Sequence, residues 1–205
     1  MDVSDLSPEA LLHDLNNVFQ TILESAGALQ ADPKWKKTAA TLTRSANRGR
    51  RIVDSINESS RPSGDLAPVA ESAIQFAQDY LECIHATPVE FSCDVESGFR
   101  LTGSPAAWER VLVNLLLNSA QAGAKRASIA AHKNEIVIED DGAGISGDLL
   151  PRIFEPHVST KPAMSGLGLS IVQSIVEKNG GVVSAANRGG GGAVFTIRLN
   201  RAAAA

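Results

Sequence analysis

The hydrophobic periodicity of the chain changes near residue 60. Before that point, apolar residues recur at steps of three and four, which is the spacing of an amphipathic helix. Two such runs flank a turn at Asp32-Pro33: Leu11, Leu15, Val18, Ile22, Ala26 and Leu29, then Ala39, Leu42, Ala46, Gly49, Val53 and Ile56. Two helices of this length cannot enclose a core alone. Residues 1–60 are therefore predicted to form an antiparallel helical hairpin that pairs with a second copy into a dimeric four-helix bundle.

After residue 60, helical and strand-like segments alternate without a regular βαβ repeat. A linker with serine, proline and glycine, residues 59–65, precedes them. Periodicity predicts helices at 68–83, 105–122 and 167–178, and strands at 89–94, 99–102, 127–131, 135–139, 182–186 and 193–199. This mixture predicts an α+β chain whose second domain, residues 61–200, is an α/β sandwich.

The composition argues against several classes of protein. The 205 residues are 43% hydrophobic and 20% charged, which is ordinary for a globular chain that buries a core. A net charge of −4 argues against binding nucleic acid through its phosphates. The sequence has no apolar run of the roughly 18–20 residues that span a bilayer, and its first residues lack the pattern of a signal peptide. We therefore expect a cytoplasmic protein that binds neither nucleic acid nor a membrane.

His13 is the first candidate for chemistry. At about 100° per residue it shares a polar stripe of the first predicted helix with Asn17, and Asp14 flanks it. An exposed, near-neutral imidazole is a competent nucleophile. Asp14 could orient it or accept its proton, and Asn17 could hold a water or a phosphoryl oxygen. A solvated helix face that happens to contain a histidine explains the same residues, so this motif alone is weak.

Asn114 and Asn118 lie four residues apart on one face of an otherwise apolar predicted helix. Amides buried without partners cost free energy, so these two belong either to a buried polar network or to a ligand site. Their oxygens suit a hard cation such as Mg²⁺, which takes few protein ligands and several phosphate oxygens.

Two glycine-bearing segments follow. One is Asp140-Asp141-Gly142-Ala143-Gly144 after a strand, and the other is Gly166-Leu167-Gly168-Leu169 at the start of a helix. Backbone N–H groups at a helix N-terminus bind phosphate, and glycines permit close approach, although a simple turn would have the same sequence. The glycines of residues 142–147 also match the dinucleotide-binding fingerprint, but Pro151 follows too soon for the required helix. A Walker-type loop is absent from the sequence.

In this order the segments resemble the conserved boxes of the two-component sensor histidine kinases. Their ATP-binding domain is shared with gyrase-type topoisomerases, heat-shock chaperones and mismatch-repair ATPases. The resemblance extends from about Pro8 to Leu199 and rests on these segments: His13-Asp14-Leu15-Asn16-Asn17, Asn114 to Asn118, Asp140-x-Gly142-x-Gly144, Ile153-Phe154-Glu155-Pro156 with Ser159-Thr160-Lys161, Gly166-Leu167-Gly168-Leu169 and Gly180-Gly181. Each box is weak alone, and the ordered set is strong evidence.

The resemblance implies a Bergerat-type sandwich that binds ATP and Mg²⁺. Asp140, in the first glycine box with Gly142 and Gly144, would accept a hydrogen bond from the adenine amino group. Asn118 would bind Mg²⁺ with Asn114 in support. The phosphates would be cradled by Lys161 and by the second glycine box: Gly166, Leu167, Gly168 and Leu169.

The resemblance also implies that the chain is a protein histidine kinase. His13, assisted by Asp14, would attack the γ-phosphorus of ATP. The phosphoryl group would then pass to an aspartate of a response regulator receiver domain. We further expect phosphatase activity, with Asn17 holding the hydrolytic water. About seven residues precede the first predicted helix, so the chain is expected to be either a fragment or the partner of a separate sensor protein.

Three alternatives remain open at the level of sequence. A phosphotransfer adaptor of the same architecture would relay phosphate without autokinase activity, but its glycine boxes should be eroded and those here are present. A serine kinase that antagonises a sigma factor leaves the helical pair and His13 unexplained. A catalytically idle dimerisation module would carry His13 only as a surface residue.

Overall fold

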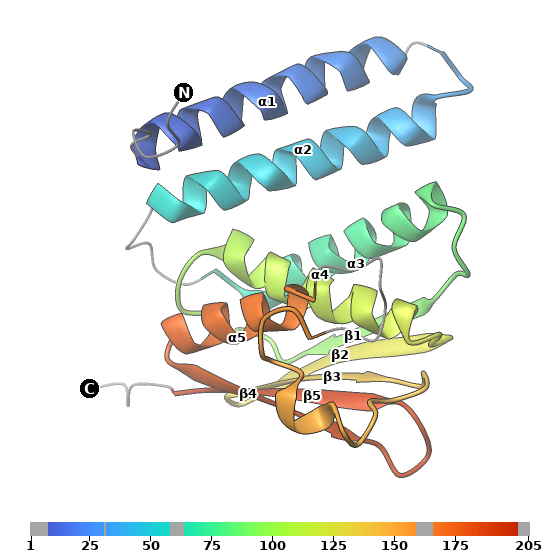
Figure 1. Cartoon of the computed structure of the whole chain (residues 1–205), viewed down its shortest axis with the longest axis vertical. Coiled ribbons are helices and arrows are strands. Elements are labelled where there is room, and N and C mark those ends of the chain that lie inside the picture. Colours follow the sequence, from blue (N-terminus) through green and yellow to red (C-terminus); the bar gives the residue numbers. More distant parts are fainter. Residues whose placement is uncertain (1–7, 31, 58–63, 159–165, 201–205) are drawn as a thin grey trace.

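The computed structural model describes residues 8–30, 32–57, 64–158 and 166–200, and it shows two long helices beside an α/β part (Figure 1). Helix α1 (Pro8–Leu29) and helix α2 (Lys36–Asn57) run antiparallel and pack against each other. The turn between them is closed by Asp32, whose Oδ1 accepts a hydrogen bond of 2.9 Å from the backbone N–H of Lys34. Such an Asx turn explains why the helical pattern breaks at this point.

Small residues let α1 and α2 approach closely. Ala26 of α1 and Ala39 and Ala46 of α2 are buried. The ring of Phe19 lies over Gly49, where an added Cβ would be only 2.3 Å from Cε1 of that ring. The pairing of the two helices therefore depends on the missing side chain at Gly49.

Helix α2 covers only part of the apolar surface of α1. Leu12 is buried, whereas Leu15 and Val18 of the predicted apolar stripe remain 36% and 54% exposed. The same holds for Leu11 and Leu29 at the two ends of the stripe. Within one chain, the helical pair thus leaves a row of large apolar side chains on its surface.

The α/β part is built on a five-stranded sheet with the strand order β1-β2-β3-β5-β4. Its strands are β1 (Glu90–Val95), β2 (Arg126–His132), β3 (Glu135–Asp140), β4 (Gly181–Asn187) and β5 (Ala193–Leu199). Strand β1 pairs with β2 in parallel, and the other three pairings are antiparallel. One face of the sheet is covered by α3 (Leu66–Cys83), α4 (Pro105–Gln121) and α5 (Gly168–Lys178), and a short 3₁₀ turn, η2 (Leu150–Arg152), precedes α5 (Figure 1).

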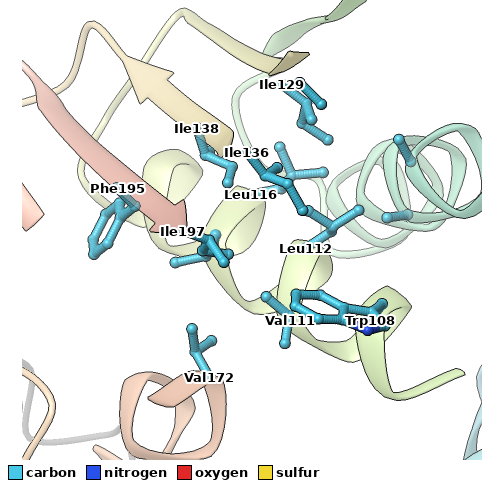
Figure 2. Packing of buried hydrophobic residues seen from close by; sticks show 14 of the residues in the cluster. Trp108, Val111, Leu112, Leu116, Ile129, Ile136, Ile138, Val172, Phe195 and Ile197 are labelled. Atoms are coloured by element: carbon cyan, nitrogen blue, oxygen red, sulfur yellow. The ribbon is translucent and has the colours of Figure 1, made fainter. Parts of the chain in front are cut away.

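Helix α4 lies at the centre of the core. It begins with Pro105 in its first turn, a position that needs no backbone N–H. Trp108, Leu112 and Leu116 of α4 are fully buried, and Figure 2 shows the labelled side chains of α4 packed with those of β3 and β5. Burying a side chain of this size contributes about 1.5–3 kcal/mol. The α/β sandwich predicted from the sequence is confirmed.

The strand predicted at residues 99–102 is wrong. The backbone of Arg100 pairs with that of Asp65 in a single isolated β-bridge. The backbone N–H of Leu66 donates to the carbonyl oxygen of Phe99 at 2.9 Å. Phe99 and Leu101 are both buried in the core. These two side chains therefore anchor a loop in the core that includes α3 and α4, and the segment does not extend the sheet.

None of the helices in the described ranges is both long enough and apolar enough to cross a membrane.

Candidate functional site

Asp140 is the last residue of β3, and only 3% of its surface is exposed. Its Oδ1 accepts hydrogen bonds from the backbone N–H groups of Gly142 (2.9 Å) and Ala193 (3.2 Å). Its Oδ2 accepts one from the hydroxyl of Ser119 at 3.1 Å. Since two carboxylate oxygens offer about four acceptor positions, these bonds fix the orientation of the group and leave capacity for a ligand. The end of β3 thus presents one buried, oriented acceptor.

Asn114 and Asn118 are half-buried side chains of α4. The amide nitrogen of Asn118 is buried and has no hydrogen-bond partner among the described residues. Asn114 Nδ2 lies 3.5 Å from the carbonyl oxygen of Gly168, at the start of α5. A buried donor left unpaired costs about 1–3 kcal/mol, so Asn118 is better suited to a ligand than to the core. Its amide fits phosphate with a hard cation, since the N–H can donate to phosphate and the oxygen can bind Mg²⁺.

Gly142 and Gly144 shape the loop after Asp140. A Cβ on Gly142 would lie 2.9 Å from the carbonyl oxygen of Ala122, just beyond the end of α4. Gly144 has a φ of +74°, and its Cβ would lie 2.8 Å from Oδ1 of Asn187. Neither position has room for a side chain, so both glycines of this predicted box are required by the packing of the loop.

Gly166 and Gly168 lie at the start of α5. Gly166 has a φ of +64°, and its carbonyl oxygen accepts a hydrogen bond of 3.1 Å from the backbone N–H of His157. Gly168 is the first residue of α5, where backbone N–H groups without helical partners can bind phosphate. The two remaining residues of this box serve the helix: Leu167 O accepts from the hydroxyl of Ser170 at 2.9 Å, and Leu169 packs against the core.

These groups lie on helix α4 or contact it or its C-terminal end. Ser119 of α4 contacts Asp140, Asn114 of α4 contacts Gly168, and the carbonyl oxygen of Ala122 accepts a hydrogen bond of 3.0 Å from Ala143 N–H. The structure therefore brings the asparagines and both glycine boxes to one helix. Lys161, with Ser159 and Thr160, lies outside the described residues.

The predicted phosphoacceptor group lies elsewhere. His13, Asp14 and Asn17 all belong to α1, which α2 separates from the α/β part (Figure 1). The side chains of Asp14 and Asn17 are exposed, and that of His13 lies outside the described residues. In this arrangement the structure does not bring α1 to the Asp140 site.

Asp141 has a structural role that the sequence did not reveal. Its Oδ1 accepts hydrogen bonds from the backbone N–H groups of Lys125 (2.7 Å) and Arg126 (2.8 Å), and Arg126 Nε lies 3.2 Å from its Oδ2. The hydrogen bond from the Arg126 backbone is the largest of several contacts that lower the pKa of the Asp141 carboxyl. Strand alternation could have assigned the two acids, because Asp140 must face the core when Asp141 faces outward.

Asn187 and Arg188 were also missed. Both side chains contact the loop that begins at Asp140, although they are more than 40 residues away in sequence. Nothing in their local pattern marks them. Two surface hollows do not include the asparagines of α4. One of 560 Å³ is lined by residues that include His132 and Lys133, and one of 340 Å³ is lined in part by Asp140.

A buried aspartate after a central strand, paired asparagines on the adjoining helix and glycines at two turns thus lie together in one α/β sandwich. Residues 103–203 match the family model of histidine kinase-, DNA gyrase B- and HSP90-like ATPases. The matched segment includes Asp140, Asn114, Asn118 and both predicted glycine boxes.

The similar curated proteins are sensor histidine kinases. ZraS of Klebsiella oxytoca is 32% identical over 183 residues, which are 82% of this chain and 39% of ZraS. AfsQ2 of Streptomyces coelicolor is 29% identical over 218 residues, covering 96% of this chain and 41% of AfsQ2. The chain thus spans about two fifths of the length of these relatives. The resemblance to two-component histidine kinases that the sequence predicts is confirmed.

Solved structures show the same fold. The mycobacterial sensor histidine kinase MprB has a TM-score of 0.59 at 24% identity and covers 68% of this chain and 97% of its own. Full-length ShkA in complex with AMPPNP has a TM-score of 0.60 at 19% identity and covers 95% of this chain and 46% of its own.

Proposed function

We propose that the chain is an ATP-dependent protein histidine kinase of two units, residues 1–60 and residues 61–200. The second unit binds ATP, and the γ-phosphoryl group is transferred to His13 and then to an aspartate of a response regulator receiver domain. The observation that carries this proposal is Asp140, a buried and oriented acceptor at the end of β3 beside two asparagines of α4. The match of residues 103–203 to the model of histidine kinase-, DNA gyrase B- and HSP90-like ATPases supports the choice of nucleotide.

The groups around α4 suit ATP with Mg²⁺. Asp140 would accept a hydrogen bond from the adenine amino group, and Asn118, with Asn114 in support, would hold the cation. The start of α5, from Gly166 to Leu169, and Lys161 would bind the phosphates. When bound, Mg²⁺ supplies positive charge against the phosphate oxygens during transfer. A related protein, ShkA, was crystallised with the nucleotide AMPPNP.

The first unit would present the acceptor. Asp14 follows His13 on α1 and would orient the imidazole or take its proton. Asn17, one turn further, would hold a water that hydrolyses the phosphoryl group on the regulator, which gives the chain phosphatase activity as well. Because α2 separates α1 from the α/β part, transfer requires His13 to approach the nucleotide, either within one chain or between two copies.

Two copies are expected for a separate reason. Leu11, Leu15 and Val18 lie exposed on α1 and would be covered when a second helical pair completes a four-helix bundle. The signal would reach this homodimer through a further segment of a longer protein or through a separate sensor protein.

The chemistry of the phosphorylated product tests this proposal. The full chain is incubated with γ-labelled ATP and Mg²⁺, and the labelled protein is then treated with acid or with alkali. Phosphohistidine loses its label in acid and keeps it in alkali, whereas phosphoserine is stable in acid. We expect acid-labile, alkali-stable label. Acid-stable label would instead support the serine kinase, and absence of label would support the adaptor or the idle module.

A further inference from the structure

The tip of the β4–β5 hairpin packs directly against the loop that follows Asp140. Gly192 has a φ of +89°, and a Cβ there would lie 1.9 Å from the carbonyl oxygen of Asp140. The next residue, Ala193, donates its backbone N–H to Asp140 Oδ1 at 3.2 Å. The hairpin backbone therefore contacts both the main chain and the carboxylate of Asp140.

Two side chains of this hairpin hold the two ends of the loop. Asn187 Oδ1 accepts a hydrogen bond from the N–H of Ile145, and Asn187 Nδ2 donates to the carbonyl oxygen of Ile145, both at 2.7 Å. Arg188 Nη1 donates to the carbonyl oxygen of Asp140 at 2.9 Å, and its Nη2 lies 3.5 Å from Glu139 Oε2. Each end of the segment from Asp140 to Ile145 thus has its own support.

The loop depends on such support because two of its residues are glycines, which have unusual backbone freedom. Its conformation determines where the N–H of Gly142 points, and that N–H forms the 2.9 Å hydrogen bond to Asp140 Oδ1. Asp141 takes no part in this contact, since its carboxylate binds the backbone of Lys125 and Arg126. A shift of the loop would therefore reorient the Asp140 carboxylate.

We propose that Asn187 and Arg188 are positioning residues that fix the loop from Asp140 to Ile145 for recognition of the adenine base. Both side chains bind loop backbone and act on the nucleotide only through Asp140. The inference rests on the proposed binding of ATP. Within the described residues, the phosphate side of the site, at Asn118 and Gly168, forms no hydrogen bond with this hairpin. Its affinity for phosphate should therefore be independent of Asn187.

Nucleotide selectivity separates positioning from a general structural role. The full chain, with Mg²⁺, is titrated calorimetrically with ADP and with GDP. Asn187→Ala removes both hydrogen bonds to Ile145, so we expect ADP affinity to fall about tenfold, which corresponds to about 1.4 kcal/mol. GDP affinity should change much less, because it depends on the phosphates, and the ADP-to-GDP affinity ratio should fall.

Matched variants complete the experiment. Arg188→Ala should lower the same ratio, and Arg188→Lys should restore part of it by keeping a donor near the Asp140 carbonyl. Arg198→Ala is the control, because Arg198 lies on β5 of the same hairpin but pairs with Glu135 at 2.6 Å. It should leave both affinities unchanged.

A wild-type ratio in Asn187→Ala and Arg188→Ala, or an equal loss of ADP and GDP affinity, would overturn the positioning role while leaving the proposed function intact. A wild-type chain that binds no ADP overturns the proposed function itself. If circular dichroism shows that Asn187→Ala is unfolded, the ratio in Arg188→Ala decides, because this change removes a side chain that is 41% exposed.

Discussion

The helical pair and the α/β part keep their large apolar side chains in different places. The largest fully buried side chains, such as Trp108 and Leu112, all belong to the α/β part. Between α1 and α2 the fully or nearly fully buried residues are mainly alanines, and Leu15 and Val18 are exposed. The α/β part therefore completes a core within one chain, whereas the helical pair needs a further surface to cover its apolar residues.

Val18→Glu should have the largest effect. If Val18 is buried between two copies, each copy loses apolar burial and gains an unpaired carboxylate in the interface, at a combined cost of about 1.5–3 kcal/mol, and the change occurs in both copies of a symmetric dimer. The dimer should weaken by about 3–6 kcal/mol, on the order of 10²–10⁴-fold. Val182→Glu is the matched control, because Val182 lies on β4 and is 61% exposed.

Light scattering at micromolar concentration provides the measurement. We expect dimers for the wild type and for Val182→Glu, and a mass near the 21.5 kDa of one chain for Val18→Glu. A monomeric wild type would contradict the inference that a second copy covers the exposed apolar residues of the helical pair.

The two tryptophans test the comparison through stability. Trp108 is fully buried on α4, and its Nε1 donates to Thr102 O at 2.7 Å, whereas Trp35 near the α1–α2 turn is 42% exposed. Trp108→Ala should cost about 3–5 kcal/mol of unfolding free energy because it leaves a cavity. Trp35→Ala should cost about 0.5 kcal/mol or less. Denaturant unfolding measures both, and similar losses would contradict the difference in burial.

A glycine pair tests the contact between the helices themselves. Gly49→Ala places a Cβ within 2.3 Å of the Phe19 ring, so the helices must move apart at a cost of about 1–3 kcal/mol. Gly27→Ala meets no atom within 4 Å and should stabilise α1 by about 0.5–1 kcal/mol. Thermal unfolding followed by circular dichroism should shift in opposite directions for the two variants. Equal shifts would show that Phe19 does not pack on Gly49.

The smallest expected effect is the pH dependence of stability at Asp141. Contacts with Arg126 and Lys125 lower the pKa of this carboxyl in the folded chain. Its stabilising contribution is therefore fully present above its unfolded pKa of about 3.9, and it is lost as the pH falls through the lower folded pKa. Asp141→Asn should be less stable than wild type at neutral pH, and the gap should close in acid. Asp148→Asn, an exposed acid nearby, is the control; a gap independent of pH would contradict the assignment.

Within the α/β part, periodicity predicted some segments correctly and others wrongly. Strand β5 was predicted with its observed bounds because its apolar residues alternate strongly. The same alternation misled at residues 99–102, where burial comes from a loop that packs on α3 and α4. Sequence periodicity reports burial, and it cannot tell which neighbour provides it.

At the site, the sequence predicted the groups that motifs mark. Asp140, Asn114 and Asn118 are proposed as site residues because they occur in a recognisable order along the chain. Asn187 and Arg188 were not, because they reach the loop only after a hairpin 42–48 residues away has formed. Contacts of this kind depend on tertiary structure and leave no local pattern.

Phosphorylation of His13→Gln provides the most direct test of the proposed kinase activity. The variant and the wild type are incubated with γ-labelled ATP, and ADP binding is measured by calorimetry on the same samples. His132→Gln is the matched control, because His132 lies on β2 beside Glu96. We expect His13→Gln to lose its label and keep wild-type affinity for ADP, while His132→Gln keeps both. Wild-type labelling of His13→Gln with ADP binding intact would show that His13 is not the acceptor.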